Sequence, residues 1–425
     1  MSERENIRRS YENSSYYCRI QSFPQRPQIE ETRKATGADY ILVLMSGDFV
    51  QRGEPAIYNK YIRTRMALLG GADAVLELPV LYATSSAEFF AEGAVTLLDH
   101  MQMVDFLSFG SESGKLEDFL PLAELLNRKE ATVLSTVNEL LRQGLSYPRA
   151  RSRAVSLLFS EYSSADAAFF SSPNNILALE YCKTLQKLKS SIKPFTLLRK
   201  GSGYHDPFLP EDSSMYPSAS ALRSLITASA SSQFLTADDL SPQLFYKLLT
   251  EKDCGFSDYL DCSTALSDRI CKYLSSFTGY TDFCTLLKSR EFTYTRISRT
   301  LLHILLNQKT PVSFKPSFSE RHLKTPYVRL LGFRKDSAPL LSSIKKHSDI
   351  PLVSKLADAK TILSEEAYQM LSRDIMASTL YESATFLKYA STDFHQKTAA
   401  NNDPSFFAEA KKGLLNEYQQ SPVIL

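Results

Sequence analysis

Apolar runs and amphipathic stretches alternate through the first half of this 425-residue chain. Four short apolar runs have the length of buried strands: 40–45, 73–78, 104–109 and 194–198. Six longer stretches repeat apolar residues at helical spacing: 57–70, 85–99, 115–127, 130–143, 148–162 and 174–188. Strands that alternate with helices in this way predict an α/β fold, with a doubly wound parallel sheet covered by helices on both faces.

The pattern changes near residue 236. Three later segments, SPQLFYKLLTEKD, TALSDRICKYLSSF and YTRISRTLLHILLNQ, are helix-periodic and contain few strand-like runs. Region 324–360 mixes short strand-like runs with helix, and the sequence from 361 onward is helical but polar. We therefore predict two domains, an α/β core over 1–235 and a mainly helical module over 236–425.

The composition is that of an ordinary globular protein, with 43% hydrophobic and 23% charged residues. Because the formal net charge is only +2, a role with nucleic acid would depend on local basic patches. The six cysteines include no C-x-x-C pair, so zinc-finger spacing is absent and reduced thiols are expected. No apolar run approaches the ~18 residues of a membrane span, so we expect a cytoplasmic protein with no membrane contact.

The polar segment between the first two predicted strands marks a candidate site. The first strand breaks into Ser46–Gly47 and then into QRGEP, a helical stretch follows, and the second strand ends in ELP. Such a strand–loop–helix–strand unit places ligands at the carboxyl ends of its parallel strands. Five charged residues gather here and could hold a carboxylate or RNA phosphates, although about half of them would face solvent from the helix: Arg52, Glu54, Lys60, Arg63 and Arg65.

Six motifs follow one another along the chain: QRGEPA with the following GAD and ELP, FGSE at 109–112, SPNNIL at 172–177, GYHD at 203–206, SASALR at 218–223 and LLGF at 330–333. In this order they resemble the motifs of the bacterial tRNA(Met) cytidine acetate ligase family, with LLGF the weakest match. The resemblance implies a nucleotidyltransferase-like core that uses ATP and Mg²⁺ to activate acetate as acetyl-adenylate. It also implies transfer of the acetyl group to N4 of the wobble cytidine of elongator tRNA(Met).

The same motifs suggest which residues hold the nucleotide. Ser218, Ser220 and Arg223 match an S-x-S/T-x-x-R signature suited to the β- and γ-phosphates, where the alternative is a helix N-cap with a surface arginine. Four further residues are predicted nucleotide contacts, with a strand end, a turn glycine or an N-cap as the alternatives: Gly110, Asn174, Arg199 and Lys200. His205 could lie at the edge of the site, or it could form a structural pair with Asp206.

One motif of the nucleotidyltransferase superfamily is missing. These proteins have an H-x-G-H turn after the first strand, but Pro24 and Pro27 stand where the two histidines belong. The codons of residues 16–27, read one base later, can encode IIAEYNPFHNGH. We therefore hypothesise that residues before about 29 are an out-of-frame translation, with a divergent N-terminus as the alternative. Without those histidines, the polypeptide should bind ATP poorly and its activity is in doubt.

A basic and aromatic stretch in the helical half is the predicted tRNA surface. It contains Lys288, Arg290, Arg296 and Arg299 with Phe292 and Tyr294 between them, and plain helix packing is the alternative. The next candidate surface is Arg329, Arg334 and Lys335. Two rival functions stay open: a small-molecule nucleotidyltransferase, and a catalytically dead paralogue that binds tRNA.

Overall fold

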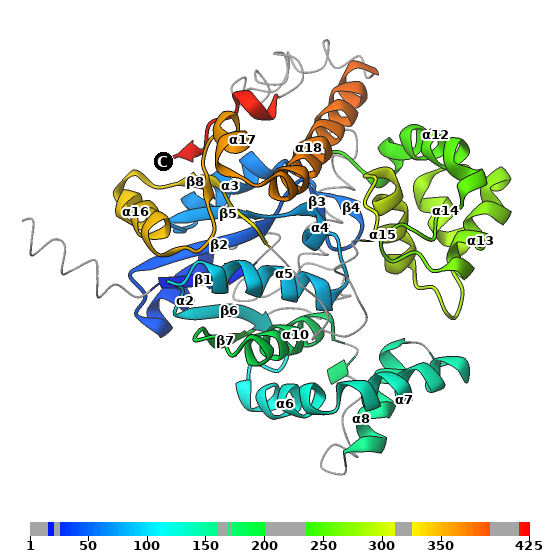
Figure 1. The fold of residues 1–425 in the computed structure, drawn as a ribbon, viewed down its shortest axis with the longest axis horizontal. Helices are drawn as coiled ribbons and strands as arrows, with labels where there is room; N and C mark the ends of the chain where they lie inside the picture. The colour runs from blue at the N-terminus through cyan, green and yellow to red at the C-terminus, as the bar shows by residue number, and fades with distance from the viewer. Residues whose placement is uncertain are drawn as a thin grey trace, which may run out of the picture.

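The computed structural model describes residues 16–20, 26–145, 147–159, 169–170, 172–199, 234–310, 325–391 and 416–425. It contains an α/β core built on one large sheet and a separate body of helices beside it (Figure 1). No helix in these ranges is long and apolar enough to cross a membrane.

The sheet has eight strands and confirms the predicted α/β fold. Seven of them follow the order β10-β8-β5-β2-β1-β6-β7, and β9 pairs with β8. All pairs are parallel except β5 with β8, which is antiparallel, so the sheet is mixed at one side. The strands are β1 (Tyr16–Ile20), β2 (Tyr40–Ser46), β5 (Ala74–Leu78), β6 (Phe106–Ser111), β7 (Lys193–Leu198), β8 (Val328–Phe333), β9 (Leu352–Val353) and β10 (Val423–Ile424).

The central strand β1 lies in a segment where the sequence indicated no convincing strand. In the structure, β1 runs parallel to both β2 and β6, with Tyr17 opposite Ile41 on one side and Phe106 on the other. The local pattern failed here because strand formation depends strongly on what flanks the segment. Two neighbouring strands offer backbone donors and acceptors, and any chain except proline can satisfy them.

Helices cover both faces of the sheet, and β2 shows how the sequence divides its side chains between them. Leu42 and Leu44 join the larger hydrophobic core, whereas Ile41, Val43 and Met45 join a smaller core on the opposite face. This alternation follows from the two-residue period of a strand. The flanking helices are α2 (Arg26–Thr36), α3 (Lys60–Leu69), α4 (Val80–Ala83), α5 (Ala87–His100) and α10 (Pro173–Leu188).

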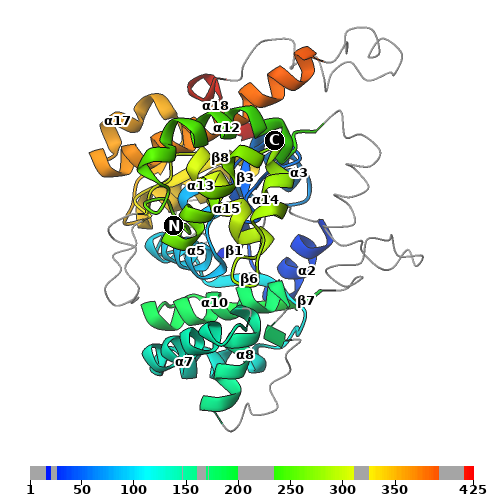
Figure 2. The ribbon, with the colours of Figure 1, turned by 90° about the vertical axis from the view of Figure 1, so that its right-hand side faces the viewer.

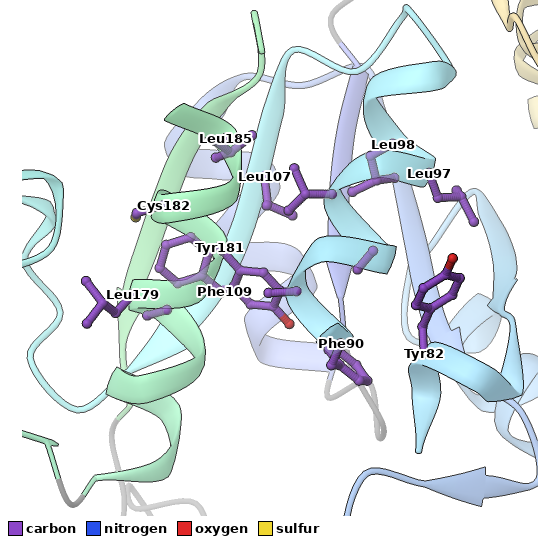
Figure 3. Close-up of a cluster of buried hydrophobic side chains, with 14 of the residues drawn as sticks. Tyr82, Phe90, Leu97, Leu98, Leu107, Phe109, Leu179, Tyr181, Cys182 and Leu185 are labelled. Atoms are coloured by element: carbon purple, nitrogen blue, oxygen red, sulfur yellow. The ribbon is translucent and has the colours of Figure 1, made fainter. Parts of the chain in front are cut away.

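The larger core lies where α5 and α10 pack on β6. Figure 3 shows Leu107 and Phe109 of β6 between side chains of the two helices. Tyr181 of α10 packs against Phe109 with their ring centroids 5.4 Å apart and their ring planes inclined by 38°. Gly93 of α5 allows a close approach of Tyr82, because a Cβ there would lie 2.2 Å from the Tyr82 ring. This packing fixes the positions of β6 and α10, whose ends carry several predicted site residues.

A helical insertion leaves the core after β6 and returns at α10. It contains η1 (Leu116–Asp118), α6 (Leu120–Arg128), α7 (Glu130–Arg142) and α8 (Tyr147–Leu158). In Figure 1 it lies below the sheet, on the side of α10.

The helical module of the second half is shorter than the sequence predicted. Residues 234–310 form a body with its own hydrophobic core, seen in front of the sheet in Figure 2. Its elements are η4 (Ala237–Leu240), α12 (Ser241–Glu251), η5 (Lys252–Cys254), α13 (Thr264–Tyr273), η6 (Leu274–Ser276), α14 (Tyr280–Leu287) and α15 (Tyr294–Leu305).

The described residues 325–391 and 416–425 belong to the core and not to the module, which differs from the boundary 236–425. β8 joins the sheet beside β5, and α18 packs against α4 of the core. The LLGF run was a short strand signal inside a mostly helical sequence, so its partner could not be read locally. The remaining elements are η8 (Lys335–Ser337), α16 (Ala338–His347), η9 (Leu356–Asp358), α17 (Ala359–Ile362), α18 (Glu365–Ser391) and η12 (Glu417–Gln419).

The QRGEP motif joins the core to the module. Gly53 lies in the turn between β3 (Phe49–Val50) and β4 (Glu54–Pro55), and its carbonyl accepts hydrogen bonds from Tyr280 Oη at 3.2 Å and Ser298 Oγ at 2.9 Å. Its φ is +81°, and a Cβ on it would lie 2.4 Å from the backbone nitrogen of Arg299. The turn therefore rests directly on the backbone of α15, where only glycine fits.

A buried histidine makes a second contact between the module and the core. His303 of α15 has Nδ1 2.9 Å from the carbonyl oxygen of Leu260 and Nε2 3.0 Å from that of Thr84, which follows α4. Burial lowers the pKa of His303. A third contact comes from Lys388 of α18, whose Nζ lies 2.8 Å from Asp239 Oδ2 of the module.

Four buried charges connect segments that are far apart in the sequence. Lys60 Nζ lies 3.1 Å from Glu77 Oε1 and 3.0 Å from Glu417 Oε2. Arg329 completes the square, with Nε 3.1 Å from Glu77 Oε2 and Nη2 2.6 Å from Glu417 Oε2. Burial and the neighbouring Arg329 oppose the charged form of Lys60, but the carboxylates outweigh them and the pKa of Lys60 is raised. We call this set the charge square.

Gly53→Ala should weaken the docking of the module on the core. The Cβ would clash with α15 and also strain a left-handed backbone, so we expect a loss of about 1–3 kcal/mol or more in the free energy of unfolding. Gly144→Ala is the matched control, because Gly144 has a φ of +90° but no atom within 4 Å of the added Cβ. Urea denaturation measures both. Equal losses of unfolding free energy in the two variants would mean that the contact between this turn and α15 does not stabilise the docking of the module.

Lys60→Met should destabilise the protein by about 3–5 kcal/mol, because it leaves two buried carboxylates with one cation. The exposed Lys345→Met on α16 should change the free energy of unfolding by less than about 0.5 kcal/mol. Chemical denaturation of both variants gives the comparison. A midpoint for Lys60→Met that matches the control would contradict a stabilising charge square.

Candidate functional site

The carboxyl ends of β6 and β7 form the edge where the predicted nucleotide contacts meet. The two strands are paired to their last residues, with Ser111 opposite Leu198. The chain continues into Glu112 after β6 and into Arg199 after β7. The first turn of α10 lies at the same edge, because its asparagines bond to Glu112. Helix N-termini at such an edge present free N–H groups that suit an anionic ligand.

The two asparagines of α10 hold the loop that follows β6. Asn174 Nδ2 donates to Glu112 Oε1 at 2.6 Å, and the backbone nitrogen of Asn175 donates to Glu112 Oε2 at 2.9 Å. In return, Asn175 Oδ1 accepts from the backbone nitrogens of Glu112 at 2.9 Å and Ser113 at 3.1 Å. Asn175 is only 3% exposed. Its role is therefore to position the loop.

An N-cap was the alternative role predicted for one asparagine of this pair. The structure differs, because Ser172 occupies the N-cap position and both asparagines lie inside the helix. Glu112 lies within the FGSE motif, but its role was not predictable, because a motif does not contain the partner of its own carboxylate. The predicted contact of Asn174 with a nucleotide stays a prediction.

Gly110 leaves room for Arg199 on the neighbouring strand. A Cβ on Gly110 would lie 3.2 Å from Cγ of Arg199, and the backbone nitrogen of Arg199 donates to the carbonyl oxygen of Ser111 at 3.0 Å. Within the described part of the chain, the half-buried Arg199 side chain has no hydrogen-bond or ion-pair partner. A guanidinium at the carboxyl edge of a parallel sheet suits a phosphate or carboxylate.

The missing H-x-G-H turn would follow the carboxyl end of the central strand, which pairs with β6. β1 ends at Ile20 and α2 begins at Arg26, so the last two of the four positions, 26 and 27, lie in the first turn of α2. Pro27 stands in the first turn of α2, where proline is tolerated because its nitrogen needs no helical partner. Five other predicted site residues lie outside the described residues: Lys200, His205, Ser218, Ser220 and Arg223.

Lys60 and Arg63 are structural, contrary to the interpretation of the 52–65 cluster as a ligand site or solvent-facing helix. Both are buried: Lys60 belongs to the charge square, and Arg63 donates to the carbonyl oxygens of Tyr58 at 2.9 Å and Ser46 at 3.1 Å. Helical periodicity assigns charged residues to the outside, so it missed cations that are buried with partners. Of the cluster, Arg52 and Glu54 are half-buried and Arg65 is exposed.

The basic and aromatic stretch is mostly packing, which was the alternative interpretation. Phe292 is 4% exposed in the core of the module, and the guanidinium of Arg296 lies 5.2 Å from its ring centroid. Arg299 pairs with Asp261 at 3.0 Å. Lys288 and Arg290 remain exposed between α14 and α15.

The second candidate RNA surface also consists mostly of side chains that already have partners within the protein. Arg329 is buried in the charge square and Arg334 pairs with Asp336 at 3.0 Å. Lys335 is exposed. Most of the predicted RNA contacts therefore already have partners within the protein.

Known proteins match this chain over most of its length. The family model described as HIGH Nucleotidyl Transferase matches residues 26–397. A tRNA(Met) cytidine acetate ligase of Clostridium perfringens strain SM101 is 37% identical over 380 residues, covering 83% of this chain and 90% of that protein. The ligase of Acetivibrio thermocellus is 36% identical over 383 residues, with the same shares covered.

Two solved structures share the fold. The apo crystal structure of Thermotoga maritima TmcAL has a TM-score of 0.80 at 24% identity and covers 97% of this chain and 99% of its own. The crystal structure of the same protein bound with alpha-thio ATP has a TM-score of 0.76. With the identities to the curated relatives, these matches lead to one conclusion: the chain belongs to the HIGH nucleotidyl transferase family and, within it, to the tRNA(Met) cytidine acetate ligases.

Proposed function

We propose that this protein is an ATP-dependent ligase that acetylates N4 of the wobble cytidine of elongator tRNA(Met) in the cytoplasm. The single observation that carries the proposal is the 37% identity over 83% of the chain to a tRNA(Met) cytidine acetate ligase. In the first step, an acetate oxygen attacks the α-phosphate of ATP and pyrophosphate leaves. In the second step, the cytidine amine attacks the acetyl carbonyl, AMP leaves and the amine gives up a proton.

The chemistry requires charge neutralisation and positioning more than a covalent nucleophile. Arg199 is the described residue best suited to a phosphate, because its guanidinium has no partner among the described residues and Gly110 opens space beside it. Ser218, Ser220, Arg223 and Lys200 would complete the phosphate contacts, and Mg²⁺ would bridge phosphate oxygens.

The N-terminal segment limits this function in the polypeptide as written. We propose that residues before about 29 are translated out of frame, which the position of β1 supports. The shifted frame can place IIAEY, an apolar strand sequence, over the five residues of β1. It then places H-N-G-H over 24–27, so that the last two of these positions coincide with the start of α2 at Arg26. The match to the family model begins at residue 26, close to the proposed change of frame.

The absence of H-x-G-H also favours a second candidate, a catalytically dead protein that binds tRNA. Acetate-dependent exchange of pyrophosphate into ATP, followed by detection of N4-acetylcytidine in elongator tRNA(Met), separates the possibilities. Exchange and acetylcytidine together support the ligase. Binding of the tRNA without either product supports the dead paralogue, and exchange that depends on a phosphorylated cofactor precursor supports a small-molecule nucleotidyltransferase.

Restoring the shifted frame over residues 16–27 should tighten ATP binding by about tenfold or more. Each histidine adds a hydrogen bond to a charged phosphate, and such a bond contributes about 1.5–3 kcal/mol. Isothermal titration calorimetry of ATP with the original and restored chains measures the difference. Equal affinities would show that the missing turn is not what limits nucleotide binding.

Asn174→Ala and Asn175→Ala in the restored chain should have different effects. Asn175→Ala leaves two backbone N–H groups without their acceptor and should cost about 1–3 kcal/mol of stability. Asn174→Ala removes a half-buried amide and should mainly weaken ATP binding. Denaturation midpoints and ATP titrations report the two effects. Unchanged ATP affinity in Asn174→Ala would leave that residue a partner of Glu112 only.

A further inference from the structure

The helices α6, α7 and α8 of the insertion carry more basic than acidic residues. Residues 120–159 contain six lysines and arginines and three acidic residues. Residues 236–310, which form the helical module, contain nine of each. A polyanion such as RNA is attracted by an excess of positive charge, and residues 120–159 have that excess whereas the module does not.

The exposed face of α8 concentrates this charge. Ala150, Ala154 and Val155 are buried on one side of the helix, while Arg149 and Arg153 are exposed on the other. The two arginines stand four residues apart, so they are neighbours on the helix surface. Like charges at this spacing repel each other and weaken the helix. Neither arginine has an ion-pair partner in the described ranges, and α8 contains no acidic residue.

A third arginine of α8 fixes the direction of this face. Arg151 Nη2 pairs with Glu180 Oε1 of α10 at 2.5 Å, and Glu180 also pairs with Lys183 at 2.8 Å. Arg151 and Lys183 together hold the pKa of Glu180 at about 2, against the effect of burial. The ion pair anchors α8 to α10, so the positions of Arg149 and Arg153 relative to the core are set by the fold.

The base of the insertion lies at the edge of the candidate site. The chain leaves the core at Glu112 and returns at Asn174, and these two residues are hydrogen-bonded to each other. In Figure 1 the insertion lies below the sheet, apart from the helical module at the right. RNA bound along the insertion could therefore extend to the carboxyl edge of β6 without contacting the module.

We propose that α8, through Arg149 and Arg153, is a contact surface for the phosphate backbone of the tRNA. The inference rests on the proposed function, because it takes tRNA as the substrate. It adds a location, since the insertion and not the helical module supplies backbone contacts. Arginine suits this role because its guanidinium binds phosphate oxygens in a fixed, bidentate geometry.

The test compares two double variants of the whole chain in binding to elongator tRNA(Met). Arg149→Gln with Arg153→Gln removes two charges from α8, and Lys345→Gln with Lys355→Gln removes two exposed charges on and near α16. Filter binding over a range of salt concentrations gives the affinity and its salt dependence. We expect the α8 variant to bind about tenfold more weakly, with a log–log salt slope smaller by about 1.4–1.8. The control should match the wild type.

The possible outcomes of this test separate the inference from the proposed function. A wild-type chain that binds no tRNA would overturn both. A wild-type chain that binds, together with an α8 variant of unchanged affinity and slope, would overturn only the inference. A third variant, Lys288→Gln with Arg290→Gln, then shows whether the module supplies the contacts instead. Circular dichroism checks that each variant is folded.

Discussion

The charge square of Lys60, Glu77, Arg329 and Glu417 is the interaction on which the assembled core depends. Each charge loses its hydration on burial, and this cost is offset only when all four are present together. The square joins α3 and β5 to β8 and to the segment around Glu417, which follow the helical module in the sequence. It thereby fixes late parts of the chain onto a sheet whose other strands come from the first half.

The carboxyl edge of the sheet carries both the candidate site and the attachments of the helical bodies. The turn at Gly53, after β2, rests on α15 of the module, and the loop at Glu112, after β6, begins the insertion. Open α/β sheets bind ligands at this edge. A small molecule held near Arg199 would therefore lie close to the point where the insertion leaves the core after β6.

The N-terminal segment separates what the fold requires from what the chemistry requires. β1 completes the centre of the sheet through its backbone, and most side chains are compatible with such pairing. A phosphate-binding turn needs particular side chains at particular positions, and the sequence at 24–27 does not provide them. The fold can therefore tolerate a change of reading frame in this segment, whereas the proposed activity cannot.

The sequence by itself determined the alternating elements of the core and the family. β2, β5, β6 and β7 lie where apolar runs predicted them, because strand and helix periods are local properties. Only the tertiary structure decided the rest. In the folded protein Lys60 and Arg63 are buried, and LLGF forms part of strand β8 in the sheet. Asn175 accepts a hydrogen bond from the loop that follows β6. These features depend on partners distant in sequence, and no local pattern contains the identity of a distant partner.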